Sequence, residues 1–295
     1  MRNFIGVDLG GTNIRAAIVS EDGTIKCMKK SESHPERGAE AVMETMISLI
    51  ESLDGYEECE GIGMGIPGPI DTINGKIIVS TNLPKLIGFP IAEYIENHFH
   101  KPTYMDNDVK VAALGEAVQG AGKDYPIVYY VTISTGVGGA LVIDQKVIGG
   151  QNGHAGEIGN ICIDRNREKY NILNVGAVEN EASGTAVTRK GKAVFGDKIN
   201  HAGDVFDLAR SGDEQALKIV DDMAYDLAMM FCAIGHIIDP HGGGVMKGKD
   251  VFFEKMESYY RSMIHVGMQP VVFKEALLDE PGIIGAAMLP MTHLK

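Results

Sequence analysis

Two segments of this chain share one pattern: an apolar strand leads into a polar glycine turn, and a second apolar strand follows. The first copy spans Asp8 to Val19 and contains Gly10-Gly11-Thr12, and the second spans Ser134 to Ile143. Their identity is low, but the pattern is specific, and the chain repeats it at about half its length. We therefore expect two related α/β halves, with a cleft between them that receives one glycine turn from each side.

Hydrophobic spacing predicts the elements around these turns. Expected strands cover residues 4–9, 14–19, 24–28, 61–66, 126–134 and 136–143, and expected helices cover 39–53, 91–99, 109–118, 214–238 and 282–289. Glycines at 120 and 122 end one of these helices and indicate a domain boundary. We expect an N-terminal small domain over 1–118, joined by a C-terminal helix at about 283–295, and a larger domain over 119–282.

Composition excludes several classes of protein. The 295 residues are 44% hydrophobic and 23% charged, as in ordinary globular chains. A formal charge of −13 with scattered basic residues argues against a nucleic-acid surface. The sequence has no signal core, no apolar run of about 18 residues and no CxxC spacing among its four cysteines. We expect a cytoplasmic protein with reduced thiols and with neither nucleic acid nor membrane as a partner.

The first glycine turn has the chemistry of a phosphate cradle. Backbone N–H groups at Gly10, Gly11 and Thr12 can approach phosphate oxygens because glycine has no Cβ, and Asp8 can hold Mg²⁺ through water. A tight hairpin with a capping aspartate explains a single turn of this kind about equally well. The second turn, residues 134–139, shifts the balance towards phosphate.

Other nucleotide-binding motifs are absent. The sequence contains no GxxxxGK[ST] motif, which excludes a P-loop. Its one GxGxxG match, Gly63, Gly65 and Gly68, runs into Pro67 and Pro69 where a helix should begin, so a dinucleotide fold is disfavoured. Two interpretations stay open for this triplet: a sharp loop that lines a pocket, or a simple turn.

A carboxylate stands between the two turns. Asn107 and Asp108 precede the helix expected at 109–118. Helix capping alone accounts for many such pairs, yet a carboxylate at a helix start also suits a base that accepts a hydroxyl proton. A base flanked by two phosphate cradles is what phosphoryl transfer to an alcohol requires, because that chemistry consists mostly of positioning and charge neutralisation. The pattern favours a kinase.

Acidic residues further along are candidates for sugar recognition, because carboxylate oxygens accept hydrogen bonds from hydroxyl groups. Glu157 lies among small residues and is the best of them. Glu179 and Glu181 precede Ser183-Gly184. For Glu181, an ordinary solvated surface position is the stronger interpretation.

Together, the motifs resemble one family, the ROK sugar kinases of the actin-like and hexokinase-like ATPase superfamily. The matching stretches occur in the family's order across nearly the whole chain, at 8–12, 65–71, 80–84, 107–116, 135–139, 156–159, 179–184, 242–245 and 282–287. The resemblance implies an α/β fold of two actin-like, ribonuclease H-like domains with a central cleft. It also implies ATP with Mg²⁺, a hexose substrate and a homodimer.

The resemblance also implies roles for individual residues, with Asp108 as the catalytic base. The expected hexose ligands are Asn82, Asn107, Glu157 and Glu179, with Asp108 and Gly68 beside them. The expected nucleotide ligands are Asp8, Gly10, Gly11, Thr12, Thr135, Gly136 and Gly138 at the phosphates, and Gly242, Gly243 and Gly244 at the adenosine. Magnesium is expected near Asp8.

Two departures from the family pattern matter. Many members bind a structural zinc through a histidine after the GEIG motif and a run of cysteines, whereas Asn160 and Ala177 take two of those positions here. Zinc is therefore not expected. In addition, His241 alone separates Asp239-Pro240 from the glycines, where relatives place an apolar strand. Either the preceding segment supplies that strand, or the adenosine side is malformed.

The sequence thus predicts an ATP-dependent sugar kinase that phosphorylates a hydroxyl, expected to be the 6-hydroxyl of an aldohexose such as glucose or allose. Fructose, mannose, N-acetylmannosamine and β-glucosides stay open as substrates, because a few pocket hydrogen bonds decide between them. A non-catalytic sugar-binding protein is the alternative from another class. A DNA-binding repressor would need a basic helix-turn-helix, for which we find no pattern in the sequence.

Overall fold

The computed structural model describes residues 1–246 and 249–294. Contacts between residues divide the chain into two compact units. Unit 1 comprises Met1–Val128, Ala140–Ala155 and Ala276–Lys295, and unit 2 comprises Tyr129–Gly139 and Gly156–Glu275. The domain limits that the sequence favoured, near 118 and 283, stay predictions.

Unit 1 contains a five-stranded mixed sheet with the strand order β3-β2-β1-β4-β7. β1 (Asn3–Leu9) pairs antiparallel with β2 (Asn13–Ser20), which pairs antiparallel with β3 (Ile25–Glu32). β4 (Ile62–Ile66) and β7 (Thr103–Asn107) continue the sheet in parallel with β1. The carboxyl ends of β1, β4 and β7 therefore lie at one edge, which is where parallel α/β sheets hold ligands.

Helices pack on this sheet. α1 (Ala39–Glu51) contacts β2 and β3, and α2 (Ile91–Phe99) contacts β7. Met43, Met46 and Ile50 follow each other at intervals of three or four residues, so they share the one face of α1 that is buried. The helices predicted at 39–53, 91–99 and 109–118 are confirmed, the last as α3 (Asp108–Val118).

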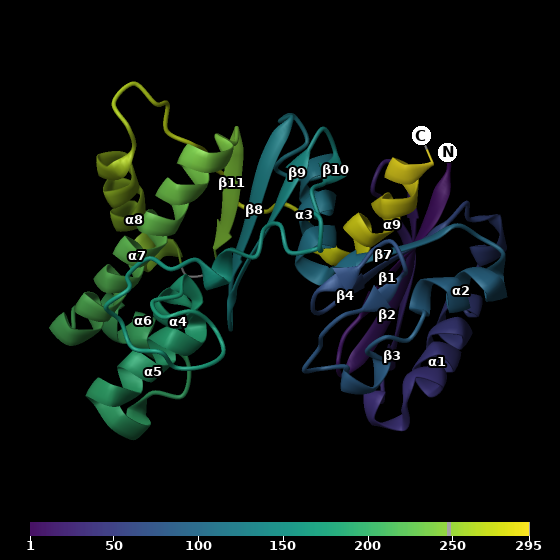
Figure 1. Cartoon of the computed structure of the whole chain (residues 1–295), viewed down its shortest axis with the longest axis horizontal. Coiled ribbons are helices and arrows are strands. Elements are labelled where there is room, and N and C mark those ends of the chain that lie inside the picture. The colour runs from purple at the N-terminus through teal and green to yellow at the C-terminus, as the bar shows by residue number, and fades with distance from the viewer. Residues whose placement is uncertain (247–248, 295) are drawn as a thin grey trace. The chain divides into compact units, whose positions relative to one another are not determined.

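The last helix, α9 (Pro281–His293), packs against α3, β1 and β4 (Figure 1). Glycines permit this close approach. A Cβ on Gly63 of β4 would lie 1.8 Å from Ala286 O, and one on Gly285 would lie 1.6 Å from Val111 O. α9 therefore brings the end of the chain onto its first strand.

Shorter elements complete unit 1. β5 (Ile70–Asp71) and β6 (Lys76–Ile77) form a two-stranded hairpin. Single 3₁₀ turns occur at Pro35–Arg37, Tyr56–Glu58 and Pro84–Leu86.

The second sheet has the strand order β10-β9-β8-β11-β12. Its strands are β8 (Ile127–Ile133), β9 (Val137–Ile143), β10 (Lys146–Val147), β11 (Gly242–Met246) and β12 (Val272–Phe273). The strands predicted at 126–134 and 136–143 are confirmed as β8 and β9. With helices around the two mixed sheets, the predicted α/β class is confirmed.

Unit 2 is mostly helical outside its strands. It contains α4 (Val178–Ala182), α5 (Gly184–Phe195), α6 (Ala202–Arg210), α7 (Glu214–Ile238) and α8 (Lys249–Met263), with 3₁₀ turns at Ile158–Asn160 and Gly196–Lys198. α7 is the long buried helix that the sequence predicted, and it contacts the four other helices. Among residues 1–246 and 249–294, no helix is both long enough and apolar enough to cross a membrane.

The glycine run predicted to lie beside adenosine belongs to a strand. α7 ends at Ile238, and Asp239 takes a left-handed conformation (φ 50°) while donating its N–H to Gly235 O at 3.0 Å. β11 then begins at Gly242 and pairs in parallel with β12. Of the two alternatives that the sequence left open, the one in which the segment before the glycines supplies the strand is wrong, because that segment is helical. The glycines are themselves part of the strand.

Candidate active site

Three predicted groups meet at the carboxyl edge of the unit 1 sheet. The strand register pairs Asp8 of β1 with Gly65 of β4, and Gly65 with Asp106 of β7. Three segments therefore leave the sheet side by side: the glycine turn after β1, the proline-glycine loop after β4, and Asn107-Asp108 at the end of β7. The structure brings together residues that the sequence assigned separately to phosphate and to sugar.

The first glycine turn is closed by its own backbone and lined by Asn82. Gly10 N–H donates to Asn13 O at 2.8 Å, which closes the β1–β2 hairpin. A Cβ on Gly11 would lie 3.1 Å from Asn82 Cβ, and both Asn82 and Thr12 are exposed. A predicted hexose ligand therefore lies beside a predicted phosphate ligand.

Asp8, the residue predicted to lie near magnesium, is held by Arg15. Nε and Nη2 of Arg15 donate to Asp8 Oδ2 at 3.1 and 2.6 Å, and Nη1 pairs with Glu280, the residue before α9. Burial opposes the charged guanidinium, but the two carboxylates outweigh it and raise the pKa of Arg15. Sequence analysis missed this cation, although the hairpin register, which places Arg15 opposite Asp8, was a usable signal.

Asn107 is the N-cap of α3 and also fixes the loop at Gly68. Its Oδ1 accepts from the N–H groups of Val109 and Lys110 at 2.9 and 3.3 Å, and its Nδ2 donates to Gly68 O at 3.1 Å. Gly68 has φ +107°, and a Cβ on it would lie 2.2 Å from Val79 O, so this close turn requires glycine. The amide of Asn107 has a second hydrogen beyond its bond to Gly68, which suits a hydroxyl acceptor.

Asp108 is the first residue of α3 rather than its cap. The capping role that the sequence offered for this pair belongs to Asn107. Asp108 is half-buried, and its Oδ1 accepts from Val109 N–H at 2.9 Å. The positive end of the helix dipole favours a negative charge at this position, which suits a proton acceptor.

Two buried charged residues next to this pair were not predicted. Asp106 and Lys110 are 6% and 2% exposed. Asp106 Oδ1 accepts from Asn107 N–H at 2.7 Å, and Lys110 Nζ donates to Gly153 O. Burial raises the pKa of Asp106, while the charge of Lys110 opposes the shift. Lys110 ties α3 to the loop at 149–155, and a lysine among the apolar residues at 109–115 was the available signal.

The second glycine turn lies at the N-terminus of α5. Ser134 N–H donates to Gly136 O at 2.9 Å, and Ser134 O accepts from Gly184 N–H at 2.8 Å. Thr135 O accepts from the N–H and Oγ1 of Thr185 at 3.3 and 2.8 Å. The turn's own carbonyls thus take the first two N–H groups of α5, while the positive end of the helix dipole still favours an anion near the turn.

Glu179 of α4 reaches the same turn. Its Oε2 accepts from Val137 N–H at 2.9 Å, and a Cβ on Gly136 would lie 2.5 Å from that oxygen. A Cβ on Gly159 would lie 3.2 Å from it. Glycine at both positions leaves the space that the carboxylate fills. A predicted sugar ligand and a predicted phosphate ligand are therefore neighbours in unit 2 as well.

The remaining predicted residues of unit 2 lie on separate elements. Glu157 is exposed and precedes the 3₁₀ turn Ile158–Asn160. Burial and, to a smaller extent, the charge of Glu157 raise the pKa of Tyr129, so the two side chains are close enough to interact. Gly138 lies within β9, and the predicted adenosine residues Gly242, Gly243 and Gly244 lie within β11.

A cavity of about 700 Å³ opens beside the second turn. Its lining includes Thr135, Gly184, Thr188 and Lys192, together with residues at the start of α6. The volume falls within the range of small-molecule and cofactor sites, roughly 300–1,000 Å³. Sequence analysis missed Lys192, because nothing local links this lysine of α5 to the glycine turn.

The structure corrects the prediction for Glu181. This residue is 3% exposed and pairs with Arg167 and Lys190. A solvated surface position is the wrong interpretation, because two cations from other segments cover the carboxylate. No group of three or more His, Cys, Asp or Glu side chains arranged for a metal ion occurs in the described part of the chain.

These features are those of a known protein class. The sequence model of the ROK family matches residues 4–292, and the chain belongs to that family. A glucokinase of Thermotoga maritima is 31% identical over 307 residues, which cover 97% of this chain and 96% of the relative.

Solved structures agree with this assignment. The chain is similar to a ROK hexokinase from Thermus thermophilus with a TM-score of 0.88 and 27% identity, covering 99% of both chains. It is also similar to a ROK family glucokinase from Streptomyces griseus in complex with glucose and AMPPNP, with a TM-score of 0.75, 25% identity and coverage of 97% and 98%. The predicted pair of actin-like domains is thereby confirmed.

Proposed function

We propose that this ROK-family sugar kinase transfers the γ-phosphoryl group of ATP to the 6-hydroxyl of an aldohexose such as glucose or allose. One observation carries the proposal. Asp108 lies at the N-terminus of α3, where the register of β1, β4 and β7 also delivers the Asp8 turn and the Gly68 loop. A carboxylate beside a phosphate turn is the arrangement that phosphoryl transfer to an alcohol needs.

In this mechanism Asp108 accepts the proton of the attacking hydroxyl as the oxygen approaches the γ-phosphorus. Asn107 holds the start of α3 through three hydrogen bonds, so the position of Asp108 is set before substrate arrives. Such general-base assistance is worth roughly 10²- to 10⁴-fold in rate.

The assignment of hexose ligands rests on the family resemblance. We propose that Asn82 and Asn107 of unit 1 contribute amide groups, and that Glu157 and Glu179 of unit 2 contribute carboxylates. Carboxylates accept hydrogen bonds from sugar hydroxyls, whereas amides both donate and accept, so each of these groups suits a hydroxyl ligand. Gly68 contributes a close backbone approach.

The nucleotide is assigned to the glycine turns. Gly10, Gly11 and Thr12 in unit 1, and Thr135, Gly136 and Gly138 in unit 2, are proposed to bind phosphate oxygens, and Gly242–Gly244 to lie by the adenosine. The cavity beside Thr135 has a suitable volume and carries the cationic Lys192. Arg15 occupies Oδ2 of Asp8, so we propose that Asp8 assists Mg²⁺ through water rather than by direct coordination.

The test replaces Asp108 by asparagine, which keeps the size of the side chain and removes the proton acceptor. We expect Asp108→Asn to lower kcat by about 10²- to 10⁴-fold while sugar affinity, measured by calorimetry, changes by only a few-fold. Asp213→Asn is the matched control, because Asp213 is a half-buried aspartate whose side chain caps the N-terminus of α7. Wild-type turnover by Asp108→Asn contradicts the proposal.

A hexose panel with coupled ADP detection decides between glucose, allose, mannose, fructose, N-acetylmannosamine and β-glucosides. The strand β11, which begins directly at the glycines, motivates one rival: a protein that binds sugar without catalysis. Sugar binding without ATP binding in calorimetry would favour that rival.

We also propose a homodimer in the cytoplasm. The four cysteines Cys27, Cys59, Cys162 and Cys232 are unpaired thiols in the structure, which fits a reducing compartment. Light scattering on the purified protein measures the assembly directly.

A further inference from the structure

The segment at 161–177 lies between the 3₁₀ turn Ile158–Asn160 and α4, and it contains no helix and only one isolated β-bridge, between Cys162 and Ala177. Side chains fix it instead. The amides of Asn171 and Asn180 bond to each other at 2.9 and 3.1 Å. The guanidinium of Arg189 lies 3.7 Å from the centre of the Tyr170 ring.

Arg167 is the centre of this arrangement and binds three carboxylates. Its Nε donates to Asp164 at 3.0 Å, its Nη1 to Glu181 at 2.8 Å and its Nη2 to Asp226 at 3.0 Å. These carboxylates belong to the segment itself, to α4 and to α7, respectively. One planar guanidinium, with its fixed fork of donors, therefore joins three parts of unit 2.

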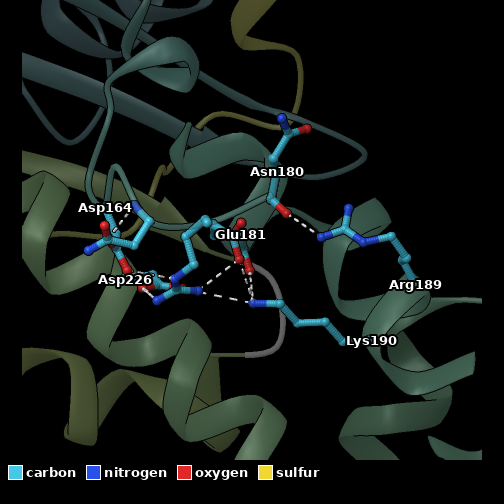
Figure 2. Close-up of polar contacts among 8 residues, drawn as sticks. Asp164, Asn180, Glu181, Arg189, Lys190 and Asp226 are labelled. Carbon is cyan, nitrogen blue, oxygen red and sulfur yellow. Dashed lines mark hydrogen bonds and ion pairs between the residues drawn. The ribbon is translucent and has the colours of Figure 1, made fainter. Parts of the chain in front are cut away.

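α5 closes the cluster from the other side (Figure 2). Lys190 Nζ lies 3.1 Å from Glu181 Oε2 and 3.8 Å from Asp226 Oδ2, and it donates to Glu181 O at 2.8 Å. Arg189 Nη2 donates to Asn180 O at 2.6 Å. Side chains of α5 thus hold the short α4 in two ways: through its backbone carbonyls and through the carboxylate of Glu181.

The cluster is buried enough for pairing to matter. The side chains of Glu181 and Asp226 are only 4% and 3% exposed. Burial raises the pKa of Asp226, and the charges of Arg167 and Lys190 oppose that shift. Removing one partner of a buried ion pair leaves an uncompensated charge, which is far more costly than losing an exposed pair.

Glu181 and Glu179 lie two residues apart on α4, so their side chains point about 200° apart around the helix axis. Glu181 faces the ion cluster, while Glu179 reaches Val137 N–H in the glycine turn. Any rotation or shift of α4 therefore moves both carboxylates together.

We infer that Arg167 is a positioning residue for sugar binding: by fixing Glu181 it holds α4 so that Glu179 meets the glycine turn at Gly136 and Val137. The inference rests on the proposed role of Glu179 as a hexose ligand. Arg167 itself touches neither the turn nor the cavity among the described contacts.

The experiment compares Arg167→Met with wild type. We expect the KM and the calorimetric Kd for sugar to rise about 10-fold, with the KM for ATP changed less than about 2-fold. A merely structural role would lower the active fraction and leave both constants unchanged, and that outcome overturns the inference. Arg167→Lys keeps the positive charge but loses the forked guanidinium. Its sugar KM and Kd are expected to lie between those of wild type and Arg167→Met.

Arg210→Met is the matched control. Arg210 also binds two aspartates, Asp207 and Asp250, but this cluster is exposed and lies away from α4. We expect wild-type constants for both substrates in this variant. A rise in the sugar KM equal to that of Arg167→Met would overturn the inference.

Two further measurements separate failure of this inference from failure of the proposed function. Amide hydrogen exchange at residues 134–139 can be measured without any enzyme activity. It should be faster in Arg167→Met, because Val137 N–H loses its fixed acceptor Glu179. Unchanged exchange overturns the inference. In the Glu179→Gln background, Arg167→Met should raise the sugar Kd much less than 10-fold. If the effects of the two substitutions on the sugar Kd are additive, the inference is contradicted. If the wild type phosphorylates no sugar, the proposed function fails, and the exchange result still decides whether Arg167 positions Glu179.

Discussion

The two glycine turns follow the same strand–turn–strand pattern, yet each obtains its carboxylate differently. In the first, Asp8 comes from the strand itself and is neutralised by Arg15 on the opposite strand. In the second, Glu179 comes from a distant helix and bonds to the backbone N–H of Val137. The first turn is therefore assembled by local hairpin register, and the second by tertiary packing of α4.

This difference has a practical consequence. Asp8 faces Arg15 across one hairpin, so their pairing needs only the β1–β2 register, although Arg15 also binds Glu280 before α9. A carboxylate held through a short helix depends on everything that holds the helix, including the cluster around Arg167. Changes near the second turn should therefore affect ligand binding more than equivalent changes near the first.

The largest contrast is expected between Gly136→Ala and Gly10→Ala. A Cβ at Gly136 would lie 2.5 Å from Glu179 Oε2, whereas one at Gly10 would lie 3.3 Å from Asn13 O. Gly136→Ala should therefore displace the carboxylate and raise the sugar KM about 10-fold or more, because a charged hydrogen bond is worth roughly 1.5–3 kcal/mol. Gly10→Ala should change it less than about 3-fold. Steady-state kinetics on both variants tests this, and equal effects would remove the distinction between the turns.

A smaller effect is expected for Arg15→Met, which removes the cation that holds Asp8. The side chains of Arg15, Asp8 and Glu280 are 33%, 25% and 28% exposed, so solvent screens the pairs partly. We expect unfolding in urea to cost about 1 kcal/mol less than in wild type, together with a changed Mg²⁺ dependence of activity. Wild-type stability and an unaltered magnesium titration would show that Arg15 does not hold Asp8 in solution.

The smallest effect is a change in stability expected from Asp106, which lies at the carboxyl end of β7 next to Asn107 and Asp108. Burial raises its pKa in the folded protein, so the ionised form destabilises the fold. The neutral carboxyl contributes stability below the unfolded pKa, near pH 4, and this contribution is lost as the pH rises through the folded pKa. Asp106→Asn should thus be more stable than wild type at pH 8, by less than about 1 kcal/mol, with the gain vanishing near pH 4. Urea titrations at several pH values measure it; a variant less stable at pH 8 refutes it.

Much of the fold could be predicted from the sequence, because the patterns involved are local. The apolar runs at 4–9 and 14–19, separated by the Gly10-Gly11 turn, predict the first hairpin, and the spacing of apolar residues in 214–238 predicts α7. The pairing of Asp8 with Arg15 was accessible by the same logic, since a turn closed by Gly10 and Asn13 fixes the register.

The rest depended on contacts between distant segments. Arg167 and Asp226 are separated by 59 positions, and no periodicity connects them. Glu181 was interpreted as solvated because an acidic residue near a loop usually is, and only the packing of α4 between α5 and α7 buries it. The strand that begins at Gly242 was missed for another reason. Glycine has a low propensity for strands, and pairing with β12 overrides that propensity.

The contact of α9 with β1 has a consequence for biosynthesis. The ribosome makes β1 long before α9, so the sheet of unit 1 acquires the helix that covers β1 and β4 only after residues 281–293 have been synthesised. Unit 2, built almost entirely from one continuous stretch, can mature earlier, and a chain stalled before 276 should leave the N-terminal strands open to protease while its later half resists digestion.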